Sequence, residues 1–130
     1  MLARLRALLA SIVVACAACS DAATPAAAHD AAPGILAAFS GTHPLARAQA
    51  LEAEGRHAEA VAAAQTALAD DPQLADLCFD RFTLGGAEIV LTPCAPISGA
   101  ARTQFVRERS LALAAMPDVV YAEPNLVAGP

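Results

Sequence analysis

Lysine and tryptophan are absent from this chain, and all eight of its basic residues are arginines. Two of them, Arg4 and Arg6, lie in an N-terminal leader, so six arginines and thirteen acidic residues remain beyond it. The chain without this leader therefore carries a net charge of about −7. An acidic chain that has no basic patch repels the phosphate backbone, which argues against nucleic acid as a partner.

Large apolar side chains are also scarce. Apolar residues make up 57% of the chain, but alanine accounts for much of that figure. The few aromatic residues are Phe39, Phe79, Phe82, Phe105 and Tyr121. A core built from so few large side chains limits the chain to one small domain.

Sequence motifs of catalysis are missing as well. There is no Gly-x-Ser-x-Gly, no His-Glu-x-x-His and no phosphate-binding loop. The pair His29-Asp30 lies in residues 20–33, an Ala- and Pro-rich segment expected to be a flexible tether, which cannot hold catalytic geometry. We therefore expect a protein that is not an enzyme and that uses no cofactor or metal.

Residues 1–19 have the pattern of an export or lipoprotein signal. Arg4 and Arg6 form a positive region, and the apolar run at residues 7–15 is too short to span a bilayer. Residues 13–16, Val-Val-Ala-Cys, resemble the bacterial lipobox, in which the cysteine is lipidated and becomes the new N-terminus. Residues 16–19, Cys-Ala-Ala-Cys, fit that pattern less well, because Cys16 occupies the usual aliphatic position.

Counting cysteines favours Cys19 as the lipidated residue. Lipidation there leaves Cys78 and Cys94 as one pair, whereas lipidation of Cys16 leaves Cys19 as an odd thiol in an oxidising compartment. Either site predicts export to the periplasm or the outer surface.

Residues 34–76 are expected to form a helical hairpin. Apolar positions recur at helical spacing over residues 44–69, Gly55 interrupts them, and Pro72 ends them. This pattern resembles one tetratricopeptide repeat, but such units need about three copies to bury a continuous core. We therefore expect the hairpin to pack on the rest of the domain. The apolar run at residues 35–40 is either a first strand or the end of the tether.

Residues 77–93 predict a β-hairpin, because Gly85 and Gly86 separate two runs of β-prone residues. Cys78 and Cys94 each lie eight residues from Gly86, so a loop centred there brings them face to face. A disulfide between them would contribute ~3 kcal/mol in the chain-entropy model. A two-cysteine metal site is the competing interpretation, and it lacks further ligands at suitable spacing.

Residues 98–125 predict a helix followed by a strand. Ser98 can cap the helix, and Pro117 disfavours helical geometry at Met116, where the helix should end. One apolar face of this helix is formed by Ala101, Phe105, Ala112 and Met116, with Val106 and Leu113 beside it. Residues 119–122 suit a strand, which Pro124 either ends or confines to a sheet edge.

This last segment resembles the end of the propeptides of subtilisin-like serine proteases, a family that also includes stand-alone inhibitors. The likeness is carried by Met116-Pro117-Asp118, then Val-x-Tyr-Ala, then Glu123-Pro124-Asn125, with the Gly-Gly hairpin before them. It covers about residues 77–125. The resemblance implies an α+β fold, in which a small antiparallel sheet of split βαβ type carries the helical hairpin and the final helix.

The resemblance also implies a function, namely an inhibitor or folding chaperone of a subtilisin-like protease. Residues 77–130 would form the propeptide-like unit, a β-hairpin, a helix and a strand followed by a C-terminal tail. The sheet would pack on surface helices of the enzyme, and the tail would enter the substrate cleft by β-augmentation. The partner-binding tail would be Glu123, Pro124, Asn125, Leu126 and Val127. Tyr121 is expected to pack against Phe105 and Met116 and so to position the strand that leads into this tail.

Two other functions remain open at this point. The helical hairpin could be the adaptor surface of a periplasmic lipoprotein that binds another envelope protein. Alternatively, the chain could be a truncated protease precursor, because such propeptides normally continue into a catalytic domain.

We predict that the exported protein is anchored to the membrane through lipidated Cys19, with Cys16 as the second choice. Intact mass of the purified mature protein tests this, because lipidation adds acyl mass at an N-terminal cysteine. A free N-terminus near Ala23 or Ala28 without acyl mass would show instead that ordinary signal cleavage releases a soluble chain.

Overall fold

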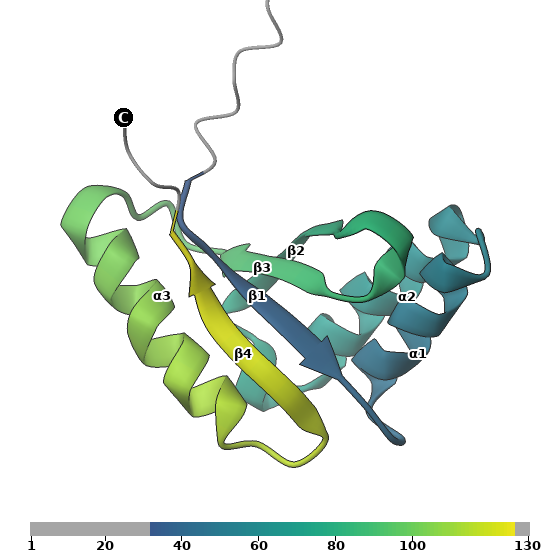
Figure 1. The fold of residues 1–130 in the computed structure, drawn as a ribbon. Helices are drawn as coiled ribbons and strands as arrows, with labels where there is room; N and C mark the ends of the chain where they lie inside the picture. The colour runs from purple at the N-terminus through teal and green to yellow at the C-terminus, as the bar shows by residue number, and fades with distance from the viewer. Residues whose placement is uncertain (1–31, 127–130) are drawn as a thin grey trace, which may run out of the picture.

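The computed structural model describes residues 32–126, which form a small α+β fold. A four-stranded antiparallel sheet has the order β2-β3-β1-β4 (Figure 1). The strands are β1 (Gly34–Phe39), β2 (Leu77–Phe82), β3 (Ile89–Pro93) and β4 (Val119–Asn125). The helices are α1 (Pro44–Ala53), α2 (His57–Asp70) and α3 (Gly99–Ala114), with short 3-10 turns at Pro72–Leu74 and Leu84–Gly86. This is the connectivity of a split βαβ sheet, with a helical hairpin in place of the first helix.

The apolar run that begins at Ile35 belongs to a strand and is not the end of a linker. It forms β1, which occupies an interior position in the sheet and pairs with β3 on one side and β4 on the other. Alternation along β1 sends Ile35, Ala37 and Phe39 to one face, where all three are buried in the core. The partner residues of this layer on β3 are Leu91 and Ile89, which are also buried.

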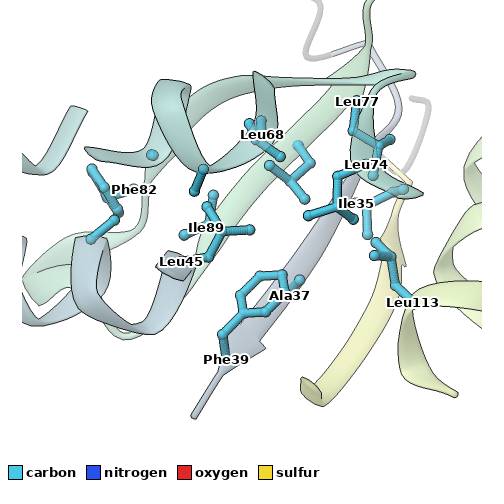
Figure 2. Close-up of a cluster of buried hydrophobic side chains, with 14 of the residues drawn as sticks. Ile35, Ala37, Phe39, Leu45, Leu68, Leu74, Leu77, Phe82, Ile89 and Leu113 are labelled. Carbon is cyan, nitrogen blue, oxygen red and sulfur yellow. The ribbon is translucent and has the colours of Figure 1, made fainter. Parts of the chain in front are cut away.

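All three helices pack on this same face of the sheet. The inward side chains of β1 share one core cluster with Leu45 of α1, Leu68 of α2 and Leu113 of α3 (Figure 2). Because the core contains several alanines, the helices contribute small side chains where they approach the sheet, such as Ala48 and Ala64. The single repeat-like hairpin therefore packs on the rest of the domain, as expected for a unit without further copies.

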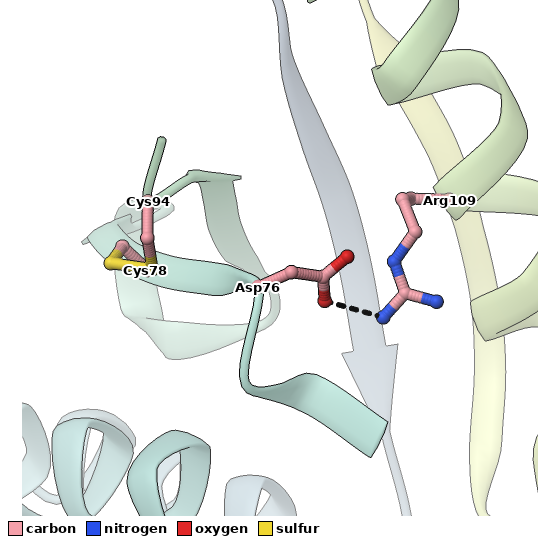
Figure 3. Close-up of a disulfide and its surroundings, with 4 residues drawn as sticks. All are labelled: Asp76, Cys78, Cys94 and Arg109. Atoms are coloured by element: carbon pink, nitrogen blue, oxygen red, sulfur yellow. Dashed lines mark hydrogen bonds and ion pairs between the residues drawn. A yellow bond between two sulfur atoms is a disulfide. The ribbon is translucent and has the colours of Figure 1, made fainter. Parts of the chain in front are cut away.

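The predicted disulfide between Cys78 and Cys94 is present, with a Cα–Cα distance of 5.1 Å (Figure 3). The two residues are not directly opposite, however, because Cys78 pairs with Thr92 and the bridge runs diagonally to Cys94. A register shift near Asp80 adds a residue to β2, so the hairpin is not symmetric about Gly86. Disulfides persist in oxidising compartments, which is consistent with an exported protein. Within residues 32–126 no helix is long and apolar enough to cross a membrane.

The buried face of α3 differs from the predicted one. Val106 and Leu113, which were expected beside the apolar face, are buried together with Ser110, whereas Phe105 and Met116 only flank the core. Ala101 and Ala112, which were expected on the inward face, are exposed. Ser110 fits inside because its hydroxyl donates to the carbonyl oxygen of Val106 at 2.7 Å, and a satisfied hydroxyl is tolerated in a core.

Gln49 of α1 is the buried polar residue that ties the helical hairpin to the sheet. Its Oε1 accepts from the N–H of Phe39 at 2.9 Å, at the end of β1. Its Nε2 donates to the carbonyl oxygens of Gly86 and Ala87, at 3.2 and 2.5 Å. Gly86 must lie close to α1 for these bonds, and an added Cβ there would lie 2.8 Å from Gln49 O.

We predict that Gln49→Ala lowers the free energy of unfolding by about 2 kcal/mol or more, because it strips partners from buried backbone groups. Gln65→Ala is the matched control, since Gln65 is exposed on α2 and surface changes stay within about 0.5 kcal/mol. Chemical denaturation of the three oxidised proteins measures the difference. Equal stability of the two variants would show that the Gln49 hydrogen bonds contribute nothing measurable.

Candidate partner-binding surface

The second face of the sheet is not covered by any helix of residues 32–126, because all three helices lie on the other side. We call it the open sheet face. The strand pairing shows which residues are neighbours on this face. Leu36 of β1 lies between Val90 of β3 and Glu123 of β4, and Ala38 of β1 lies opposite Tyr121 of β4. The residues that strand alternation places on it are Gly34, Leu36, Ala38, Cys78, Arg81, Val90, Thr92, Tyr121, Glu123 and Asn125.

The middle of the open sheet face is apolar and its rim is charged. Leu36 and Val90 lie side by side on the two interior strands, where Leu36 is half-buried and Val90 is buried. Tyr121 flanks them on β4 and is 37% exposed. Glu123 lies next to Leu36 on the β4 side. Arg81 stands beside Val90 on the β2 side, where it forms an ion pair with Asp80. This surface therefore offers the exposed side chain of Tyr121 on β4, half-buried Leu36 beside it, and mostly acidic groups nearby.

Tyr121 is held across the face by a hydrogen bond from its hydroxyl to the carboxylate of Glu88. This bond raises the pKa of Tyr121 to about 12, with smaller contributions from burial and from the negative charges of Glu88 and Glu123. The cause is that deprotonation would place a phenolate against a carboxylate and remove the donor. The bond links β4 to the start of β3 over the intervening β1.

The predicted packing of Tyr121 against Phe105 and Met116 is wrong. Those two side chains contact the core on the helix side of the sheet, where Ala122 and Val119 also point. Tyr121 precedes Ala122, so strand alternation directs it to the opposite face. The sequence-based expectation treated a scarce aromatic residue as part of the core, whereas alanine fills the inward position.

The predicted tail begins later than expected. β4 continues through Glu123, Pro124 and Asn125, which pair with Leu36, Ile35 and Gly34 of β1. Pro124 is tolerated because β4 is an edge strand, as the sequence allowed.

Beyond the strand, only Leu126 of the predicted tail is described, and its side chain is partly exposed. Val127 lies outside the described residues. The same holds for Cys16, Cys19 and the N-terminal signal.

A groove on the helical hairpin is a second candidate binding surface. It is an open groove of about 570 Å³ between the start of α1 and the second half of α2. Its lining is largely apolar, with one arginine and two aspartates at its margins: Pro44, Arg47, Ala62, Ala63, Thr66, Ala67, Asp70, Asp71 and Pro72. In residues 32–126 no cluster of three or more His, Cys, Asp or Glu side chains could hold a metal ion.

The chain matches no protein-family model, no curated protein and no solved structure. Of the predicted site residues, the structure brings Tyr121 and Glu123 together on the open sheet face, with Asn125 farther along β4. Sequence reasoning missed Leu36, Val90 and Glu88. For Leu36 and Val90 the available signal was the alternation within the two apolar runs that form β1 and β3.

We predict that the phenol of Tyr121 titrates with a pKa of about 12, above the usual tyrosine pKa of about 10. Tyr121 is the only tyrosine, and tryptophan is absent, so ultraviolet absorbance reports this group alone. At about pH 11 the folded chain should keep a mostly protonated phenol, while the denatured chain should be mostly ionised.

Glu88→Gln should lower this pKa markedly, because it removes the charged acceptor. Glu123→Gln is the matched control and should lower it less, since its charge is the smallest of the contributions. A folded wild-type chain that titrates near pH 10 would contradict the Tyr121–Glu88 bond.

Proposed function

We propose that this protein is a propeptide-like inhibitor or folding chaperone of a subtilisin-like serine protease, and that it binds through the open sheet face and the tail after β4. The observation that carries the proposal is the one-sided sheet. In residues 32–126 three helices cover one face, and the other face carries an exposed aromatic side chain on the edge strand β4, which bears the propeptide-like run Tyr121-Ala122-Glu123-Pro124-Asn125.

The composition of the open sheet face supports a protein partner. Aromatic residues are enriched at the centres of interfaces because they bury a large rigid area at low entropic cost. Tyr121 is oriented in advance by its bond to Glu88, so less side-chain freedom is lost on binding. Beside it Leu36 is half-buried and adds some apolar surface, while its pair partner Val90 is buried.

Electrostatics support a partner with positive groups opposite β4. Glu88 and Glu123 lie near Tyr121, and the chain as a whole is acidic. Carboxylates are stabilised by helix N-termini, so the face suits an enzyme surface that presents helix ends. The disulfide is consistent with export, and anchoring through lipidated Cys19 or Cys16 would place the inhibitor at the membrane surface.

The tail leads directly from an edge strand toward the partner. β4 pairs with β1 up to Asn125, and Leu126 follows directly after this edge strand. An extended segment of this kind can add main-chain hydrogen bonds in a substrate cleft, with side-chain pockets for Leu126 and Val127.

The groove on the helical hairpin favours a second candidate function, that of an envelope adaptor. Its size and apolar lining suit one helix or peptide of another protein. The two functions use different surfaces, since the groove involves α1 and α2 while the open sheet face involves the strands. They can therefore be separated by variants of each surface.

We predict that the folded, oxidised protein inhibits at least one subtilisin-like protease in a panel assay. Deleting residues 126–130 should weaken inhibition by about tenfold or more, because these residues add contacts only in the complex. Tyr121→Ala should also weaken it by about tenfold or more, as loss of a central aromatic anchor does.

Leu111→Ala is the matched control, because Leu111 is 75% exposed on α3, outside the open sheet face. It should leave the inhibition constant unchanged. Failure of the folded protein to bind any protease of the panel, or equal inhibition by all four proteins, would overturn the proposal. Retained inhibition with Tyr121→Ala alone would restrict the contact to the tail.

A further inference from the structure

Leu84 is the most exposed large apolar side chain of the described residues, and it lies at the tip of the turn between β2 and β3. Its side chain is fully exposed, at 101% of the reference area. The other exposed large apolar residues lie in or next to regular elements, with Leu111 in α3, Val120 and Tyr121 in β4, and Leu126 after β4. Leu84 alone combines this exposure with a position inside a turn.

The turn protrudes at Gly85, and hydrogen bonds hold the residues on either side of it. Gly85 has φ +76°, and a Cβ built there would meet no atom within 4 Å. On either side, Thr83 N–H donates to Glu88 O at 3.0 Å, and the Gly86 and Ala87 carbonyls accept from Gln49. The peptide bond between Leu84 and Gly85 is thus the one presented to an approaching enzyme.

The same peptide bond lies inside the loop that the disulfide closes. Cys78 precedes it on β2 and Cys94 follows it just after β3, and both are in the bridge. A cut at this point divides the chain into a piece with β1, α1, α2 and β2, and a piece with β3, α3 and β4. The pieces interdigitate in the sheet, because β1 of the first pairs with both β3 and β4 of the second.

We propose that the Leu84–Gly85 bond is the primary proteolytic site within residues 32–126, and that cleavage there yields a stable two-chain form joined by Cys78–Cys94. The modifying enzyme is an endopeptidase whose specificity pocket accepts a large apolar side chain. One water molecule is consumed, the peptide C–N bond breaks, and Leu84 gains a carboxylate while Gly85 gains an amino group. Exposed loop tips are preferred sites of nicking, and the sheet pairs and disulfide keep both pieces in place.

This inference goes beyond the proposed function, and the site exists whether or not the chain inhibits a protease. If it does, the two-chain form keeps Tyr121, Glu88 and Leu36 assembled, since the cut removes none of their strand pairs. The first cut by a target enzyme then leaves the open sheet face intact. Separation of the pieces requires a reductant as well as the cut.

Limited digestion of the oxidised full chain with chymotrypsin, whose pocket accepts large apolar side chains, tests the site. Mass spectrometry without reductant should show, for the region 34–126, one species that has gained one water. After reduction the same sample should give two fragments that divide between Leu84 and Gly85. An earlier cut elsewhere in residues 34–126, or fragments that separate without reductant, would overturn the proposal.

Two variants separate exposure from local backbone shape. Leu84→Asp should slow the cut by about tenfold or more, because the apolar specificity contact is lost. Leu111→Asp should leave the rate unchanged, since its peptide bonds lie within α3. Circular dichroism of both variants establishes that they are folded, and an equal effect of the two would contradict the assignment.

Inhibition of the protease panel by the purified two-chain form is measured separately. A chain that is nicked at Leu84 but inhibits nothing would refute the proposed function alone, whereas an inhibitor that is cut elsewhere would refute the nick site alone.

Discussion

The interior position of β1 is the constraint on which this fold depends. This strand pairs on both sides, so it has no free edge, and its side chains alternate between the two faces of the sheet. Ile35, Ala37 and Phe39 enter the helix-packed core, while Leu36 and Ala38 face the other way. All helices of residues 32–126 pack against the first set, whereas on the second face Ala38 is buried, Leu36 is half-buried and Tyr121 of the neighbouring strand β4 is exposed.

Hydrogen bonds from two polar side chains hold the two ends of the sheet in place. Gln49 joins α1 to the end of β1 and to the β2–β3 turn. At the other end, Arg109 of α3 donates to Gln73 O at 2.7 Å and to the Asp76 carboxylate at 2.8 Å, close to the disulfide (Figure 3). These contacts connect α1 to the sheet and α3 to the segment just before β2, around a core rich in alanine. A surface held in this way can bind with little reorganisation.

Local sequence signals predicted most of the fold because they are strong where they occur. Gly55 and Pro72 mark real helix ends, Gly85 and Gly86 lie in a real turn, and the cysteines form the expected bridge. The inward face of α3 was harder to predict, because Ser110 is polar yet buried through its bond to Val106. A helical pattern scored on apolar residues alone therefore selected Phe105 and Met116, which only flank the core.

The candidate site was less predictable than the fold for a related reason. Which side of β4 faces the helices depends on its register with β1, and register is a tertiary property. In this pairing Ala122 meets Ala37 and Tyr121 meets Ala38, so the ring lies on the open sheet face and the small residue lies in the core. The continuation of β4 through Pro124 likewise depends on its edge position, which no local rule supplies.

The most direct measurement of the central claim is a nuclear magnetic resonance map of the isotope-labelled, oxidised chain with an inactivated subtilisin-like protease. If the open sheet face is the binding surface, amide signals of Leu36, Val90, Tyr121 and Glu123 should shift or broaden first. Signals of Ala63 and Thr66, in the groove on the helical hairpin, should stay in place. Changes confined to α1 and α2, with β1 and β4 unaffected, would contradict the account and favour the adaptor surface instead.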